Sequence, residues 1–286
     1  HLFLFTITPV QSFVMQARKA QDFYAGSNIL SGLTDMTVKE AANISKSIDV
    51  VFPKESIPSK PNRFMAIVES DDIKKFGNSL KKYVEDTFKD IIDESLRSFK
   101  TKPANYEEQI NNHLSVSWAA VEYDAAKYAQ KYKELEAVLA GAKNTRMFNQ
   151  FSDAETGRKC SLCGERNALF VADKNKFYTQ AEAQETESYL LNKNEGLCAI
   201  CAGKRFYKKA EGFVSTADIA LLHTMKKLED INYSLPGKYD PQKILIPINQ
   251  SDKEGYVDED SFDPDQIANS EKIRKKIDDS KIPLTP

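Results

Sequence analysis

The stretch that decides the fold is residues 63–99, which read RFMAIVESDDIKKFGNSLKKYVEDTFKDIIDESLRSF. Its first six residues, Arg63–Val68, are mostly apolar and predict a buried strand. From Asp71 to Phe99, apolar residues recur every three or four positions, which predicts a long amphipathic helix. Asp71 and Asp72 stand before this helix, where a carboxylate accepts hydrogen bonds from free backbone N–H groups. A strand followed by such a helix indicates a sheet with a helical layer on it.

Three further strands are expected around this unit. Residues 1–7 form a mostly apolar segment, and Asp49–Phe52 form a short second one. Residues Leu114–Ala120 alternate larger apolar side chains with serine and alanine, which predicts a strand with one packed face.

Helices are expected between the first two strands. Thr8 would cap the first of them, Pro9 suits its first position, and Gln11 completes a capping box. The tetrapeptide Ala25–Asn28 predicts a break, after which a second helix runs from about Ile29 to Ala42.

The predicted order is strand, helix, strand, strand, helix, strand, which is the split βαβ, or ferredoxin-like, pattern. Residues 1–123 are therefore expected to form an α+β domain of the ferredoxin-like (βαββαβ) type. Residues 124–250 are expected to form a mainly helical domain, which begins with a helix at Ala125–Asn144 and holds a cysteine module at 158–210. Residues 251–286 predict an acidic loop and a linker.

The four cysteines of the chain form two C-x-x-C pairs and leave none over. Two such pairs present four sulfurs to one tetrahedral zinc ion, and four protein ligands leave no position for water. A structural zinc site is therefore expected at Cys160, Cys163, Cys198 and Cys201. Buried thiols, or disulfides in a secreted protein, are the alternatives.

Composition limits the possible partners. The 286 residues carry a net charge of −2, so any contact with RNA has to be local or shared with another protein. No apolar run approaches the roughly 18 to 20 residues needed to cross a membrane. Paired cysteines at metal spacing, without a secretory signal, predict a reducing cytoplasm.

Two further segments have both a functional and a structural interpretation. The turn at Thr8–Ser12 leads from a strand into a helix N-terminus, a place that suits phosphate. On spacing alone an ordinary capped helix explains it better, because the turn has no glycine-rich loop or Walker lysine. Lys204-Arg205 and Lys208-Lys209 are the densest basic clusters, and they suit RNA phosphate, a partner subunit or a solvated helix face. The chain's three histidines receive no role.

One run of residues adds a family resemblance. Thr8–Phe13, Ala17–Lys19, Asp22–Ser27 and Leu30-Ser31 together resemble the first palm domain of the large, polymerase-like subunit of type III CRISPR effector complexes, most closely the Cmr kind. The segment Phe213–Ala220 and a four-cysteine module placed after the first palm are similar to that family too.

The resemblance implies two facing palms that bind nucleotides between them, with a Gly-Gly-Asp-Asp motif on the second. It implies that ATP, with divalent metal, is converted to a cyclic oligoadenylate or related messenger when guide and target RNA are paired within the complex. The matching nucleotide-contacting positions are Gln11, Ser12, Gly26 and Ser27, with Ser27 expected at the base and Pro9–Ser12 near phosphate.

The chain also departs from that pattern. It holds no Gly-Gly-Asp-Asp motif, and none of its histidines precedes an aspartate as in the family's nuclease domain. No catalytic residue is therefore expected here, and residues 251–286 would lead toward a second palm. The chain alone would be inactive and would supply a nucleotide half-site and contacts to other subunits. A non-enzymatic, zinc-containing RNA-binding or scaffold protein, or a degenerate palm, remains the alternative.

Overall fold

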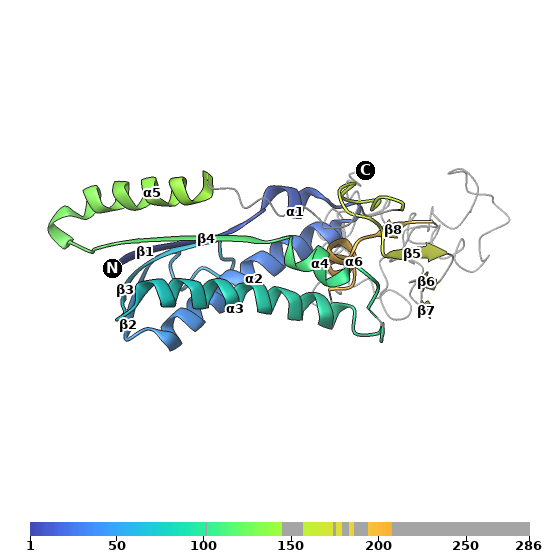
Figure 1. Ribbon diagram of the computed structural model, residues 1–286, viewed down its shortest axis with the longest axis horizontal. Coiled ribbons are helices and arrows are strands. Elements are labelled where there is room, and N and C mark those ends of the chain that lie inside the picture. The colour runs from blue at the N-terminus through green and yellow to red at the C-terminus, as the bar shows by residue number, and fades with distance from the viewer. Residues whose placement is uncertain (101, 145–156, 174–175, 179–182, 186–193, 208–286) are drawn as a thin grey trace, which may run out of the picture. The chain divides into compact units, whose positions relative to one another are not determined.

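The computed structural model describes residues 1–100, 102–144, 157–173, 176–178, 183–185 and 194–207 (Figure 1). The chain divides into two compact units, His1–Phe213 and Val214–Pro286, and every described residue belongs to the first. The predicted acidic loop and linker at 251–286 lie outside the described residues.

A four-stranded antiparallel sheet is the centre of the first unit, with the strand order β2-β3-β1-β4. The inner strand β1 (Leu2–Thr8) pairs with β3 (Arg63–Glu69) on one side and with β4 (Ser115–Val121) on the other. The edge strand β2 (Ser47–Phe52) pairs with β3. All four strands expected from the sequence are present, so the mixed α+β class with an antiparallel sheet is confirmed.

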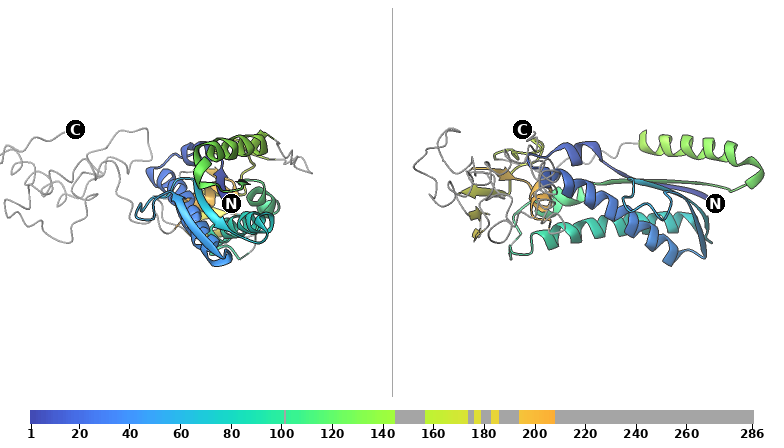
Figure 2. Two further views of the ribbon diagram at one scale, coloured as in Figure 1. Left: turned by 90° about the vertical axis from the view of Figure 1, so that its left-hand side faces the viewer. Right: turned by 180° about the vertical axis from the view of Figure 1, so that it is seen from behind.

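Helices cover both faces of this sheet, which explains why β1 is apolar on both sides (Figure 2). Side chains alternate along a strand, so Phe3, Phe5 and Ile7 share one face with helices α2 (Ala20–Ile44) and α3 (Ile73–Ser95). Leu2 and Leu4 point to the other face, where they pack with two leucines of α5 (Tyr128–Asn144).

Helix α3 begins where the sequence predicts. The Asp72 carboxylate accepts a hydrogen bond from the Lys75 backbone N–H, with N and O 2.9 Å apart, and so caps the first turn. The helix then packs closely on the sheet, because a Cβ added at Gly77 would lie 2.4 Å from the ring of Trp118.

The predicted helix boundaries in residues 8–42 are wrong. Helix α1 spans only Gln11–Met15, and α2 continues without a break through Ala25–Asn28. Thr8 does not cap α1, because the N-cap position is Val10. The Thr8 hydroxyl instead donates to the Ser115 carbonyl on the neighbouring strand at 2.9 Å. Gly26 serves close packing instead of ending a helix: a Cβ there would lie 3.3 Å from Val14 Cα in α1.

The described part of the cysteine module contains more strand than helix. A second antiparallel sheet has the order β7-β6-β5-β8 and is followed by helix α6. The expectation of a mainly helical domain over residues 124–250 stays a prediction, because much of that range, including residues 145–156 and 208–250, lies outside the described residues. The helix expected at 125–144 is confirmed. The remaining elements are α4 (Tyr106–Asn111), the 3₁₀ turn η1 (Ala125–Lys127), β5 (Phe170–Asp173), β6 (Lys176–Tyr178), β7 (Ala183–Glu185), β8 (Gly196–Leu197) and α6 (Ala199–Arg205).

The module and the sheet-covering helices share one hydrophobic core. Buried residues from β5 to α6 lie in the same cluster as the inner face of α2 and α3. A Cβ added at Gly203 of α6 would lie 2.5 Å from the Ile92 side chain of α3, so the two helices are in close contact. Within the described residues, no helix is both long and apolar enough to cross a bilayer.

Candidate metal centre and the α1–α2 connection

Two short backbone turns present the cysteine sulfurs. In the first, the Gly164 N–H donates to the Cys160 carbonyl at 2.9 Å, and Gly164 has a φ of +67°, which favours glycine. In the second, Cys198 caps the start of α6, and its sulfur accepts a hydrogen bond from the Cys201 N–H at 3.4 Å.

Hydrogen bonds between the two turns bring the pairs together. The Ser161 N–H donates to the Gly196 carbonyl at 2.7 Å, and the Gly196 N–H donates back to the Ser161 hydroxyl at 3.1 Å. The four sulfurs consequently lie within 4.8 Å of one another, with Cys163 and Cys198 Sγ atoms 3.9 Å apart.

This geometry fits a tetrahedral zinc ion. Zn–S bonds of about 2.3 Å place the sulfurs of such a site about 3.8 Å apart. All four cysteines are free thiols, and three of them are buried. The structure thus brings together the four metal ligands predicted from the sequence. A four-sulfur set leaves no position for water or substrate, so the chemistry available here is structural.

Close packing separates the pKa values of the four thiols. The pKa of Cys163 is far below its ordinary value, because the thiols of Cys160, Cys198 and Cys201 hydrogen-bond to its sulfur. The pKa of Cys198 is raised, first by Cys160 and then by Cys163. The pKa of Cys160 is also lowered and that of Cys201 is raised, so the four thiols do not ionise together by themselves. A divalent cation would supply the charge that allows all four to ionise.

The basic pair at the end of α6 is buried, which corrects the expectation of a solvated face or of an RNA contact there. Lys204 and Arg205 are both 0% exposed. Lys208-Lys209, the neighbouring pair, lies outside the described residues.

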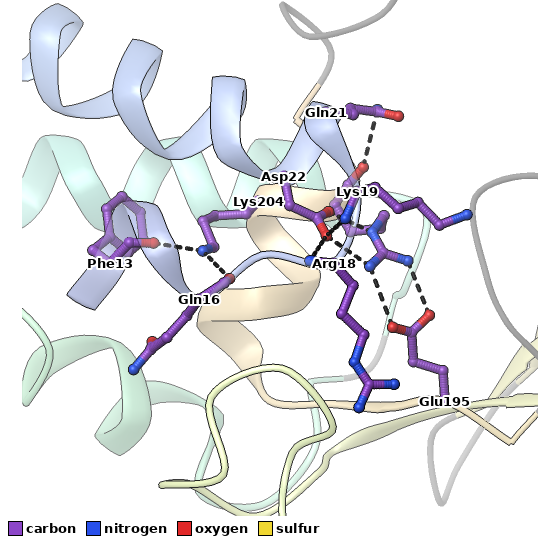
Figure 3. Close-up of polar contacts among 9 residues, drawn as sticks. Phe13, Gln16, Arg18, Lys19, Gln21, Asp22, Glu195 and Lys204 are labelled. Atoms are coloured by element: carbon purple, nitrogen blue, oxygen red, sulfur yellow. Dashed lines mark hydrogen bonds and ion pairs between the residues drawn. The ribbon is translucent and has the colours of Figure 1, made fainter. Parts of the chain in front are cut away.

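Arg205 binds the buried carboxylates of Asp22 and Glu195, both of which are labelled in Figure 3. Its guanidinium makes a two-point contact with Asp22, one bond from Nε to Oδ1 and one from Nη2 to Oδ2 at 2.8 Å. Its Nη1 donates to Glu195 Oε2 at 3.0 Å. Asp22 also accepts the backbone N–H groups of Arg18 and Lys19, each at 3.2 Å, and so caps the start of α2.

Lys204 reaches the end of α1 (Figure 3). Its ammonium donates to the carbonyls of Phe13 at 2.6 Å and Gln16 at 2.7 Å, and it lies 4.9 Å from the centre of the Phe13 ring. Burial lowers the pKa of Lys204, while the negative charges of Cys201, Asp22, Cys198 and Cys163, in that order, act in the opposite direction.

The expected nucleotide-contacting residues lie on α1 and α2. Gln11 and Ser12 are exposed in the first turn of α1, and Ser27 is exposed on α2. Gly26 is buried against α1, where it allows the two helices to approach. Phe23, one turn before Ser27 on the same helix face, is 48% exposed.

The buried charges are the residues that sequence reasoning missed. Lys204 and Arg205 interrupt an otherwise apolar run, Leu197–Tyr207, and that background was a sign of burial. No comparable sign marked Asp22, because its pairing with Arg205 depends on a contact between distant parts of the chain. Asp22 and Arg205 are 183 residues apart.

Comparison with known proteins gives a consistent result. The family model for the N-terminal region of the CRISPR-associated protein Cmr2 matches residues 2–94. No curated protein matches the chain. A chain in the cryo-EM structure of the Type III-B Cmr-beta complex bound to cognate target RNA shares 11% identity with a TM-score of 0.54, over 98% of this chain and 43% of its own length.

A chain in the apo state of Type III-B Cmr-beta gives a TM-score of 0.53 at 14% identity, over 81% of this chain and 36% of its own. The chain thus spans less than half the length of these solved chains. They establish a shared fold, and the family model supplies the sequence relationship. The resemblance to the large Cmr-type subunit is confirmed, and residues 2–94 of the chain match the model of the Cmr2 N-terminal family of CRISPR-associated proteins.

Proposed function

We propose that this chain is the N-terminal part of the large subunit of a type III CRISPR effector ribonucleoprotein. In the complete subunit, bound target RNA activates conversion of ATP to a cyclic oligoadenylate or related messenger. Residues 1–123 act as a ferredoxin-like first palm that contributes a nucleotide half-site. The zinc-bound module orders the chain beside it, and the remaining surface contacts other subunits.

The match of residues 2–94 to the Cmr2 N-terminal family is the observation that carries this proposal. That range includes the whole α1–α2 segment. The antiparallel strand order β2-β3-β1-β4, with helices between β1 and β2 and between β3 and β4, supports the ferredoxin-like palm. The similarity to Cmr-beta chains supports assembly with RNA, since one of those structures is bound to target RNA.

The proposed half-site uses the exposed side chains of α1 and α2. Ser27 donates or accepts a hydrogen bond at the adenine edge, and exposed Phe23 offers a ring on which the base stacks. Gln11 and Ser12 face the phosphates with amide and hydroxyl donors. Gly26 contributes indirectly, because its missing side chain sets the distance between the two helices.

A scaffold that only binds RNA is the competing function, and one finding weakens it. The basic pair Lys204-Arg205 is fully buried, so it offers no charge to RNA phosphate. Several other described cations near the sheet pair with carboxylates of their own helix, as Lys39 does with Asp35 and Lys82 with Asp86.

The test is messenger synthesis by the complete effector complex with ATP and target RNA. Ser27→Ala is compared with Ser79→Ala, which removes an equally exposed serine hydroxyl from α3. Because Ser27→Ala loses one hydrogen bond to the base, its KM for ATP is expected to rise by about tenfold. The Ser79→Ala variant is expected to keep the wild-type KM. Equal KM values for the two variants would contradict the half-site, and absence of any messenger would contradict the enzyme.

A second comparison locates the catalytic carboxylates. The 286 residues contain no Gly-Gly-Asp-Asp motif, so this chain by itself is expected to make no messenger from ATP. A version extended through the following domain is expected to do so when RNA is bound. Synthesis by the short chain would show that residues within 1–286 perform the chemistry.

A further inference from the structure

Helix α6 links the cysteine cluster to the α1–α2 connection. Cys198 and Cys201 lie at its start, and Lys204 and Arg205 end it one turn later. Residues three and four apart lie on the same side of a helix, so Lys204 and Arg205 follow Cys201 along its buried surface. All four of these side chains are buried.

Lys204 holds the end of α1 through backbone carbonyls. Its ammonium donates to the Phe13 and Gln16 carbonyl oxygens, which belong to the last turn of a helix of five residues. The final carbonyls of a helix have no partner within the helix, and a cation placed there is stabilising. The contact thus fixes where α1 ends and where the connection to α2 begins.

The charge of Lys204 has to be balanced inside the protein. A buried ammonium is costly without a nearby negative charge. In the part of the chain that the structure describes, its hydrogen bonds go to neutral carbonyls. The negative charges that favour its ionised form are those of Cys201 first and then Asp22, whose carboxylate also binds Arg205. A zinc ion with four thiolates carries a net charge of −2, and it would lie one helical turn away.

Arg205 provides a parallel link to the start of α2. It binds Asp22, which caps α2 through the backbone N–H groups of Arg18 and Lys19. Gln21 adds a hydrogen bond from its side chain to the Arg205 carbonyl at 3.3 Å. Both ends of the α1–α2 connection are therefore held by consecutive residues of α6.

We infer that the metal centre holds the α1–α2 connection in place through the charge of Lys204, which makes Lys204 a positioning residue for the proposed nucleotide half-site. The structural half of this inference depends only on contacts within residues 1–207. Its link to ATP rests on the proposed function.

The first test measures amide hydrogen–deuterium exchange of the wild-type protein with metal bound and after metal removal by a chelator under reducing conditions. Exchange in residues 11–19 is expected to accelerate at least tenfold. Residues 47–69, the β2–β3 hairpin, serve as the internal reference and are expected to change less than twofold. Unchanged exchange in 11–19, or equal acceleration in both segments, would overturn the inference.

The second test separates charge from shape. Lys204→Met keeps the length of the side chain and removes the charge, Lys204→Arg keeps the charge, and Lys82→Met is the control at an exposed lysine. If the bound metal stabilises the Lys204 ammonium, the ammonium stabilises the bound metal to the same extent. Removing the charge is therefore expected to weaken zinc affinity about tenfold, as measured by competition with a chromophoric chelator. The Lys204→Arg variant is expected to stay within threefold of wild type.

Equal zinc affinity for Lys204→Met and Lys82→Met would overturn the inference. If Lys204→Met does not fold, the exchange experiment on wild type still decides it. In the assembled complex, Lys204→Met is expected to raise the KM for ATP and to leave kcat within about twofold. If Lys204→Met weakens zinc affinity but does not change the KM for ATP, the link between Lys204 and the metal centre is supported. The proposed position of the nucleotide would then be contradicted.

Discussion

Single residues in this protein show that burial decides the role of a charge. Arg205 is a basic residue beside a metal-binding motif, yet it is 0% exposed and pairs with Asp22 and Glu195. By contrast, Arg97 pairs with Glu94 in solvent, with both side chains more than half exposed. The two arginines make similar contacts in very different surroundings.

Replacing each arginine by leucine distinguishes these surroundings. Arg205→Leu leaves two carboxylates buried without their cation and is expected to lower the free energy of unfolding by about 3–5 kcal/mol. Arg97→Leu is expected to cost less than about 1 kcal/mol. Urea unfolding measures both, and similar losses would show that the buried network contributes nothing beyond a surface pair.

His113 provides a prediction for pH. Burial, then the charges of Arg166 and Lys204, lowers its pKa from 6.5 to about 3. The folded protein therefore keeps this imidazole neutral, and it packs 5.0 Å from the Phe13 ring and 5.6 Å from the Phe88 ring. Because the unfolded chain takes up the proton first as pH falls below 6.5, stability is expected to decrease by up to about 1.4 kcal/mol per pH unit toward pH 3.

His113→Phe removes this titrating group and keeps an aromatic ring. Its free energy of unfolding is expected to fall less steeply than that of wild type between pH 6 and pH 4. Metal content is measured at each pH so that loss of zinc is not mistaken for the histidine. Parallel curves for the two proteins would contradict the assignment.

Helices α3 and α6 pack closely on neighbouring elements, and a glycine lies at each of these contacts. Gly77 lets α3 pack on Trp118, and Gly203 lets α6 pack on Ile92. Gly32 in α2 is different, because no atom lies within 4 Å of a Cβ added there. Replacing glycine by alanine is therefore expected to have opposite effects on stability at Gly77 and at Gly32.

Gly77→Ala is expected to destabilise the protein by about 1–3 kcal/mol, since a methyl group would overlap the indole ring. Gly32→Ala is expected to stabilise it by about 0.5–1 kcal/mol, because alanine favours the helix and meets open space. Thermal unfolding of the two variants checks both signs. Destabilisation by both would show that α2 at Gly32 is more closely covered than the structure indicates.

Most of the described helices and strands were predictable from the sequence, but the contact between α1 and α2 was not. The apolar period in 63–99 predicted β3 and α3, and Asp72 predicted the start of the helix, because these depend on neighbouring residues. Gly26 was misinterpreted, since a glycine within a helical pattern suits either a helix end or close packing against another helix. Only the position of α1 in the structure shows that Gly26 serves close packing and does not end a helix.

Part of the candidate site was likewise predictable from the sequence, and part was not. The four cysteines were predictable because C-x-x-C spacing is itself the geometry of the metal site, and the structure places the sulfurs together. The network around Lys204 and Arg205 was not, because Phe13, Gln16 and Asp22, which bind them, lie more than 180 residues earlier in the chain.

At the scale of the molecule, the sheet and the cysteine module share one core, so they are expected to unfold together. Trp118 is the chain's only tryptophan and stacks on Phe3 in the sheet, so its fluorescence reports on the sheet. Release of zinc to a chromophoric chelator reports on the module. The two midpoints in urea are expected to coincide, and release of zinc well before the change in fluorescence would indicate separate units.

A closed four-sulfur metal centre is expected to hold this core, and X-ray absorption at the zinc edge tests it directly. Protein purified under reducing conditions is expected to contain one zinc per chain, with four sulfur ligands at about 2.3 Å. Absence of metal, or an oxygen or nitrogen ligand in place of one sulfur, would contradict the structural centre from which the positions of α6, α1 and α2 have been argued.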